Sequence, residues 1–187
     1  MALNPFSEEQ IIARLQFENP WWASGNLDSY YRALNPRLYF TLFYPLVKHS
    51  AVHRATVLMG PRRVGKTVML YHAIQQLIAD GVPAQKIMYA SVETPIYNNI
   101  PLHDLFNMAK KATGNTESDG WYIFFDEVQY LKDWEVHLKT LVDSFRQTKF
   151  IASGSAAAAL KLKSNESGAG RFTDFMLPPL TFFEFIH

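Results

Sequence analysis

Short apolar runs alternate with amphipathic stretches along most of this chain. The runs that predict strands are 55–59, 86–92, 121–128, 149–152 and part of 172–177. Helical spacing predicts a helix after the first run, which Gly81 and Pro83 end, and further helices at 102–112, at 134–145 behind an Asp133 cap, and at 156–163. This alternation predicts a three-layer α/β fold, with helices on both faces of a mainly parallel five-stranded sheet.

The first 50 residues follow a different pattern. The expected order is a helix from the capping residue Ser7 to about Phe17, an irregular aromatic stretch at 21–35, and a helix at 38–49 that Pro45 perturbs. No low-complexity linker separates these residues from the later strands. We therefore expect residues 1–50 to form a helical, aromatic extension packed on a core at 51–187.

Residues 60–67 match the phosphate-binding pattern GxxxxGK followed by Ser or Thr, between an apolar strand and an amphipathic helix. The phosphate-binding residues predicted here are Gly60, Pro61, Arg62, Arg63, Val64, Gly65, Lys66, Thr67 and Val68. The two glycines let successive backbone N–H groups surround a phosphate, and the following helix adds its positive end. Lys66 is expected to contact the β- and γ-phosphates, and the Thr67 hydroxyl to bind Mg²⁺. Arg62 and Arg63 fill variable positions, where a solvent-facing charge and a phosphate or partner contact are both open.

The apolar run at 121–125 ends in two acids, Asp126 and Glu127. Parallel strands bring their carboxyl ends to one edge of the sheet, so both carboxylates are expected to reach the phosphate loop. Asp126 is the expected outer ligand of Mg²⁺, through water, and Glu127 the expected base that orients water for attack on the γ-phosphate. A polar strand end that merely faces solvent is the alternative. An acid directly after the aspartate favours ATP hydrolysis over GTP hydrolysis, and no NKxD guanine signature is present.

Two further candidates are less sharply defined by sequence. Ser153 or Ser155, after the fourth apolar run, could sense the γ-phosphate or position water, and a turn that caps the next helix is the alternative. Arg171 could offset charge on the γ-phosphate of its own or a neighbouring subunit, and an exposed or ion-paired arginine is the alternative.

Composition narrows the picture only modestly. The formal net charge of +1 over 187 residues gives no global case for nucleic acid as a partner, although local basic clusters leave it open. Cysteine is absent, which rules out disulfides and thiolate chemistry. The N-terminus lacks a secretory leader pattern and no apolar run is long enough for a membrane span, which favours the cytoplasm and gives no membrane partner.

The motifs GPRRVGKT, YIFFDEVQYLKDWEVHLKTLVD, KFIASGSAAAAL and GAGRFTDFMLPPLTFFEF, in this order, resemble those of AAA-family ATPases of the AAA_14 type over about residues 52–187. The resemblance implies a P-loop NTPase fold of the ASCE or AAA+ kind, and it implies family roles for Lys66, Thr67, Asp126, Glu127, Ser153 or Ser155, and Arg171. Family members commonly continue into a helical lid and a C-terminal domain of the DUF4143 type. The resemblance therefore implies an ATPase core that lacks both, with Phe182, Phe183, Phe185 and Ile186 on a partly uncovered apolar surface.

Two functional hypotheses follow. In the first, the protein binds ATP and Mg²⁺ and hydrolyses ATP as a nucleotide-driven switch or motor, with a protein partner or further copies of itself. In the second, it is a regulatory module that binds nucleotide with little turnover, in a setting such as a defence or toxin-related complex. Phosphoryl transfer to a small molecule is disfavoured because Glu127 suits water activation.

Overall fold

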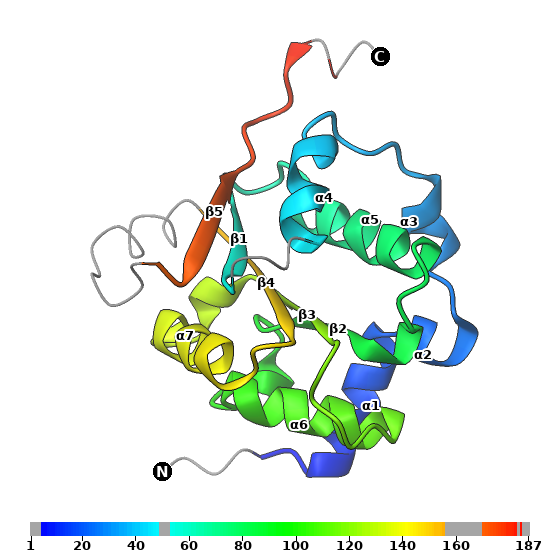
Figure 1. The fold of residues 1–187 in the computed structure, drawn as a ribbon, viewed down its shortest axis with the longest axis vertical. Coiled ribbons are helices and arrows are strands. Elements are labelled where there is room, and N and C mark those ends of the chain that lie inside the picture. Colours follow the sequence, from blue (N-terminus) through cyan, green and yellow to red (C-terminus); the bar gives the residue numbers. More distant parts are fainter. Residues whose placement is uncertain (1–4, 49–52, 156–169, 183, 185–187) are drawn as a thin grey trace.

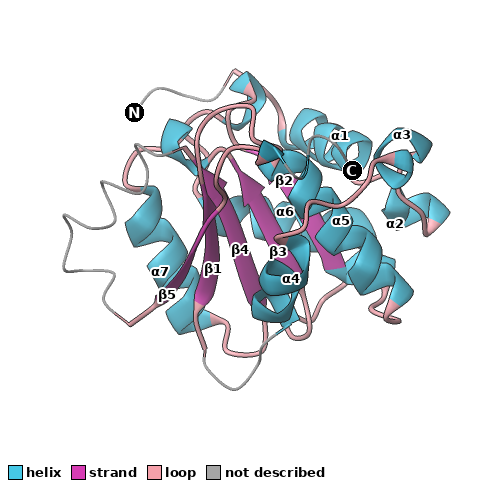
Figure 2. Cartoon of the chain, turned by 90° about the horizontal axis from the view of Figure 1, so that it is seen from above, coloured by secondary structure: helices cyan, strands magenta, loops and turns pink. Residues whose placement is uncertain are grey.

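The computed structural model describes residues 5–48, 53–155, 170–182 and 184. Its strands are β1 (Ala55–Met59), β2 (Ile87–Ser91), β3 (Tyr122–Asp126), β4 (Lys149–Gly154) and β5 (Phe172–Met176). They form one sheet in the order β2-β3-β4-β1-β5, and every pairing between them is parallel. Figure 2 shows this order, with β5 at one side and β2 at the other. The predicted five-stranded sheet is confirmed.

Helices cover both faces of the sheet. These helices are α4 (Phe40–Lys48), from the N-terminal segment, and α5 (Lys66–Ala79), α6 (Leu102–Thr113) and α7 (Trp134–Ser144), with short 3-10 turns η1 (Ala84–Lys86), η2 (Pro95–Tyr97) and η3 (Val128–Tyr130). Figure 1 shows α4 and α5 on one side of the sheet and α6 and α7 on the other. The three-layer α/β fold is therefore confirmed. The helix predicted at 156–163 lies outside the described residues.

The strands are apolar because they are covered on both faces. All five residues of β1 are buried, and Ile123, Phe124 and Phe125 of β3 have no exposed surface. A parallel sheet between two helical layers has no polar face, so its strands read as continuous apolar runs rather than alternating ones.

The N-terminal segment differs from its prediction in one part. Helix α1 (Glu8–Glu18) begins at Ser7 with a complete capping box, as expected. The stretch at 21–35, expected to be irregular, instead contains two short helices, α2 (Trp21–Ser24) and α3 (Ser29–Ala33). Burial explains α2, because Trp21 and Trp22 are both buried against the sheet. Helix α3 has no buried residue, and it begins with a cap in which the Asp28 side chain accepts the Tyr30 N–H at 2.8 Å.

Side chains of this segment bind the outer edge of β2. The Asn19 amide donates to the carbonyl of Tyr89 at 2.8 Å, and the Tyr89 N–H donates back to the Asn19 Oδ1 at 2.6 Å. The indole N–H groups of Trp21 and Trp22 both donate to the carbonyl of Ile87, at 2.9 and 2.7 Å. These bonds satisfy backbone groups that an edge strand would otherwise leave open for pairing with another chain.

Two smaller predictions also need comment. Asp133 precedes α7 as expected, but it has φ 53° and its side chain makes no capping hydrogen bond, so the prediction of a side-chain cap is wrong. Its carbonyl accepts the N–H groups of Val136 and His137 instead, at 3.0 and 3.2 Å. Pro45 lies within α4, which continues to Lys48.

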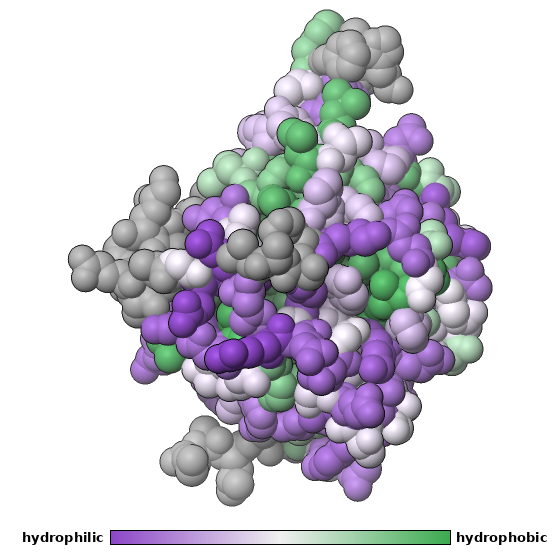
Figure 3. Space-filling model, in the orientation of Figure 1, coloured by the Kyte–Doolittle hydropathy of each residue, from purple (hydrophilic) through white to green (hydrophobic). Residues whose placement is uncertain are grey.

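Apolar side chains also remain on the surface. Figure 3 shows some of them in the upper part of the face drawn, where α4 and the segment that follows β5 lie. Phe182, in this segment, is 78% exposed, as predicted, whereas Phe183, Phe185 and Ile186 lie outside the described residues. Within the described ranges, no helix combines the length and the apolar character that a membrane crossing would need.

Candidate functional site

The phosphate loop joins the carboxyl end of β1 to the start of α5. Gly60 is required for space, because a Cβ built there would lie 2.4 Å from the carbonyl oxygen of Leu177. Gly65 is required for its backbone conformation, since its φ of 90° is strained for any residue with a side chain. The sequence argument for both glycines is thus supported by two different physical causes.

Lys66 points back into the loop that precedes it. Its ammonium group is buried and donates to the carbonyls of Gly60 at 3.3 Å and Pro61 at 3.0 Å. Its Nζ also lies 4.0 Å from the Glu127 Oε1. The loop carbonyls therefore take the place that an anionic ligand would occupy around a buried cation.

Asp126 is the most highly connected side chain of the site, and only 1% of it is exposed. Its Oδ2 accepts from the Thr67 hydroxyl at 2.7 Å and from the Tyr89 phenol at 2.8 Å. Its Oδ1 accepts from the Ser153 hydroxyl and, at 3.1 Å, from the Glu127 N–H. Four donors compensate the burial of this carboxylate and fix the plane of its oxygens.

Glu127 sits at a sharp turn after β3. It has φ 56° and ψ 46°, a left-handed conformation that costs a non-glycine residue about 1–2 kcal/mol. Strain of this kind tends to persist at functional sites, where the surrounding structure enforces it. The turn directs the carboxylate toward Lys66, and the Gln129 side-chain amide donates to its Oε2. Gln129 in turn accepts the Ser155 N–H at 3.0 Å, so β4 also supports this arrangement.

Arg171 does not join this group. It precedes β5, and its carbonyl accepts the Ala55 N–H at 2.9 Å, at the amino end of β1. The phosphate loop follows Met59 at the other end of that strand, roughly 13 Å away at about 3.3 Å per residue. The Arg171 Nε instead donates to the Asp143 Oδ1 at 2.5 Å. A contact from Arg171 to a phosphate bound in the same chain, one of the two roles considered above, is therefore not compatible with this fold.

Comparison with known families agrees with this geometry. The profile of the AAA_14 family, described as an AAA domain, matches residues 52–186. The chain belongs to the AAA_14 family. Among solved structures, the AAA_14 domain resembles Hsp104, imaged by cryo-EM in a closed state with ATPγS and FITC casein, with a TM-score of 0.56 and 16% sequence identity. That match covers 89% of this chain and 30% of the other, and at this identity it supports the fold alone.

Three curated relatives also match, and all are uncharacterized proteins. One from Haemophilus influenzae is 28% identical over 131 residues, covering 70% of this chain and 32% of the relative. Two from Methanocaldococcus jannaschii are 28% and 29% identical over 135 and 136 residues, covering 27% and 28% of their lengths. The chain thus spans about a third or less of each of these relatives.

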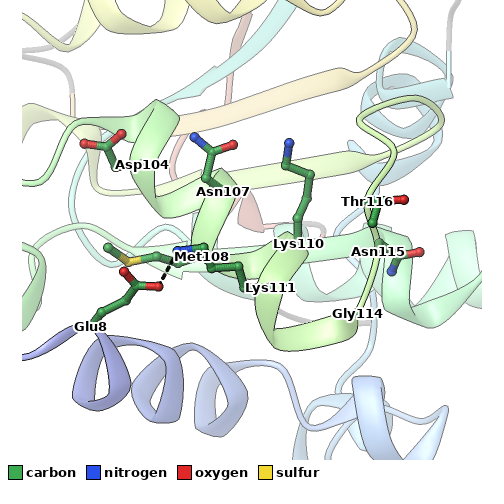
Figure 4. Close-up of a pocket in the computed structure, with 9 residues that line it drawn as sticks. All are labelled: Glu8, Asp104, Asn107, Met108, Lys110, Lys111, Gly114, Asn115 and Thr116. Atoms are coloured by element: carbon green, nitrogen blue, oxygen red, sulfur yellow. Dashed lines mark hydrogen bonds and ion pairs between the residues drawn. The ribbon is translucent and has the colours of Figure 1, made fainter.

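A cavity of about 400 Å³ opens beside the phosphate loop of this AAA_14 domain. Thr67 lines it, together with Tyr89, Ser91 and Glu93 from β2 and the turn after it, and side chains of the N-terminal segment complete its wall. A larger cavity of about 740 Å³ lies elsewhere, on α6, where Glu8 pairs with Lys111 (Figure 4). Neither the phosphate loop nor the two acids line it, so its size does not identify the functional site.

The donor set suits a magnesium nucleotide. Thr67 and Asp126 present hard oxygen atoms within hydrogen-bond distance of each other, which are the ligands that Mg²⁺ prefers. A Cβ built at Gly65 would meet no atom within 4 Å, so the space beside this residue of the loop is open for a phosphate to approach the backbone amides. Lys66 supplies a buried cation beside them.

Three residues of this site were not found from sequence. Tyr89 lies inside an apolar run, and its role becomes visible only when β2 pairs with β3. Arg37 donates to the Val64 carbonyl at 2.7 Å from a segment without any recognisable motif. Of the three, Gln129 could most readily have been predicted from the sequence, because a side chain two positions after Glu127 can reach back across a turn. Of the variable loop residues, Arg62 donates to the Tyr130 hydroxyl at 3.1 Å.

Proposed function

We propose that this AAA_14 domain binds MgATP and hydrolyses it to ADP and phosphate. The observation that carries the proposal is the 2.7 Å hydrogen bond from Thr67 to Asp126, which joins the phosphate loop to the acidic strand end. Bound Mg²⁺ would supply positive charge that offsets the charge developing on the phosphates. Thr67 and Asp126 are the residues that would hold it.

The remaining side chains have distinct roles in this proposal. Lys66 exchanges its contacts with the Gly60 and Pro61 carbonyls for oxygens of the β- and γ-phosphates. Glu127 holds a water molecule for attack and accepts its proton, from a position whose backbone is fixed by the turn after β3. Ser153 fixes the Asp126 carboxylate and the Glu127 N–H together, which gives it a positioning role rather than a direct contact with water.

Single-turnover release of labelled phosphate tests the hydrolytic step. Glu127→Gln is expected to retain MgATP and to lose about 100-fold or more of the release rate, because the amide cannot accept the proton of water. Glu117→Gln is the control, since the Glu117 side chain is 80% exposed and lies before β3, at the opposite end of that strand from Glu127, and it is expected to leave the rate unchanged. Equal rates in the wild type and Glu127→Gln would refute hydrolysis by this mechanism.

A second candidate is a nucleotide-binding module with little turnover. Two contacts favour it: the Gln129 amide already binds the Glu127 carboxylate, and Lys66 is satisfied by loop carbonyls. Tight binding of MgATP without phosphate release in the wild-type protein would support this candidate. The proposed setting is the cytoplasm, with a protein partner or further copies of the chain as the element that responds to nucleotide.

A further inference from the structure

Tyr89 is the donor to Asp126 that lies outside the predicted motifs. It lies on β2, pairs with Phe124 of β3 in the sheet register, and is 3% exposed. Its phenol donates at 2.8 Å to the Asp126 Oδ2, the same oxygen that accepts from Thr67 at 2.7 Å. The two hydroxyl groups therefore hold one carboxylate oxygen from two sides.

The backbone of Tyr89 is held by the N-terminal segment. The Asn19 side chain contacts both the N–H and the carbonyl of Tyr89, at 2.6 and 2.8 Å, as a neighbouring strand would. Asn19 is itself only 1% exposed and is fixed to α1 through the Leu15 carbonyl at 2.7 Å. Since β2 is the edge strand, this clasp replaces the second strand partner that Tyr89 lacks.

The ring of Tyr89 is held by aromatic packing. It packs on Tyr71 of α5 with ring centroids 4.8 Å apart, and Tyr71 stacks on Tyr31 of α3 at 4.0 Å. A phenol carries its proton at neutral pH, so this ring acts toward Asp126 as a hydrogen-bond donor.

We propose that Tyr89 is a positioning residue for magnesium, which keeps the Asp126 carboxylate aligned with Thr67. This inference rests on the proposed nucleotide site. Its physical basis is that the outer partners of a metal-binding carboxylate set its orientation. Ser153 and the Glu127 N–H hold the Asp126 Oδ1, whereas Tyr89 shares the Oδ2 with Thr67 and holds the oxygen on that side. The N-terminal segment contributes to the metal site through Tyr89, although its helices carry no ligand.

The test is the magnesium dependence of nucleotide binding by Tyr89→Phe. Binding of a fluorescent ADP derivative is measured first with EDTA and then during a Mg²⁺ titration. Loss of one hydrogen bond to a charged group is expected to raise the Mg²⁺ concentration for half-maximal enhancement about tenfold. Binding in EDTA is expected to change less than about twofold, because Lys66 and the loop amides are untouched. A general loss of structure would weaken nucleotide binding both in EDTA and in the presence of Mg²⁺.

Tyr97→Phe is the matched control. Tyr97 is 2% exposed and also donates to a carboxylate, the Glu18 Oε2 at 2.9 Å, but it does not contact Asp126. Its magnesium dependence is expected to equal that of the wild type. Equal magnesium dependence in Tyr89→Phe and Tyr97→Phe would overturn the inference while leaving the proposed function intact. A wild-type protein that binds no nucleotide would overturn the proposed function itself, and this inference with it.

A second variant keeps the test open if Tyr89→Phe does not fold. Asn19→Ala releases both backbone contacts of Tyr89 and leaves its phenol in place. Asn19→Ala is expected to raise the magnesium concentration for half-maximal enhancement about threefold, since the backbone that carries the Tyr89 ring is then held less firmly. An unchanged magnesium requirement in a folded Asn19→Ala protein would contradict the claim that the Asn19 contacts hold Tyr89 in position. Thermal unfolding confirms which variants are folded.

Discussion

The two ends of the same sheet use charged residues in opposite ways. At the carboxyl end, Asp126 is almost completely buried and accepts four hydrogen bonds, and Lys66 lies buried close by. At the amino end, Arg171 and Asp143 form an ion pair at 2.5 Å, with side chains 46% and 43% exposed. An exposed pair contributes about 0–1 kcal/mol to stability, whereas a buried network holds its members in fixed positions. Strand direction, and not charge alone, separates a functional edge from an ordinary surface.

The largest effect is expected at the carboxyl edge. Lys66→Ala removes the buried cation beside the phosphate loop and should weaken MgATP binding by at least about 100-fold, because each hydrogen bond between charged groups contributes about 1.5–3 kcal/mol. Isothermal titration calorimetry measures this loss directly. Lys111→Ala is the control, since Lys111 of α6 is 62% exposed and pairs with Glu8 of α1, away from the phosphate loop. Comparable affinity for MgATP in the Lys66 and Lys111 variants would contradict the claim that the buried lysine binds the phosphates and the exposed one does not.

An intermediate effect, on the stability of the fold, is expected at the ion pair between Arg37 and Glu184. This pair is largely shielded from solvent but lies outside the group formed by Asp126 and Glu127. The Arg37 side chain binds Glu184 at 2.7 Å and the Val64 carbonyl of the phosphate loop at 2.7 Å. The hydrogen bonds that Arg37 donates to the Glu184 carboxylate are the main cause that lowers the pKa of Glu184 to about 2, from an ordinary 4.5. The pair therefore stabilises the folded state fully above pH 4.5, and this contribution is lost as the pH falls toward 2.

Glu184→Gln tests this pH dependence. At pH 7 the variant should be less stable by about 1–2 kcal/mol in urea unfolding, since a hydrogen-bonded charge is lost. The difference from the wild type should shrink below pH 4.5, become small near pH 2 and vanish below it. A difference that stays constant across this range would show that the ionised carboxylate is not what stabilises the fold.

The smallest effect is expected at the amino edge. Arg171→Ala should change stability by no more than about 1 kcal/mol and leave ATP hydrolysis by the isolated chain unchanged. Steady-state phosphate release and thermal unfolding measure both. A loss of hydrolysis of tenfold or more would contradict the assignment of Arg171 to an ordinary surface, and it would place this side chain at the nucleotide of a neighbouring copy.

Local sequence patterns predicted the sheet well because parallel strands are continuous apolar runs. The first strand was predicted at the residues where β1 lies, and the capping box at Ser7 fixed the start of α1. The position of Arg171 follows from the same pattern, since a residue before a parallel strand must lie at its amino end. The hypothesis that Arg171 contacts a phosphate in its own chain did not take this position into account.

Other features depend on packing that no local pattern reports. A strand buried on both faces gives no signal about which side chain reaches the site, so Tyr89 was not distinguished from its neighbours. Helix α2 forms because its buried tryptophans bind the edge of β2, and α3 lies on α5 through the stacked rings of Tyr31 and Tyr71, against weak local propensity. At Asp133 the backbone carbonyl accepts N–H groups from the first turn of α7, and the expected side-chain cap is absent.

The most direct test of the account is a crystal structure with MgADP and a γ-phosphate analogue. The account predicts that the Lys66 ammonium leaves the Gly60 and Pro61 carbonyls for the phosphate oxygens, and that Thr67 binds the metal beside Asp126. It also predicts a water molecule between the Glu127 carboxylate and the analogue. An empty cleft, or acidic side chains turned away from the bound nucleotide, would contradict it.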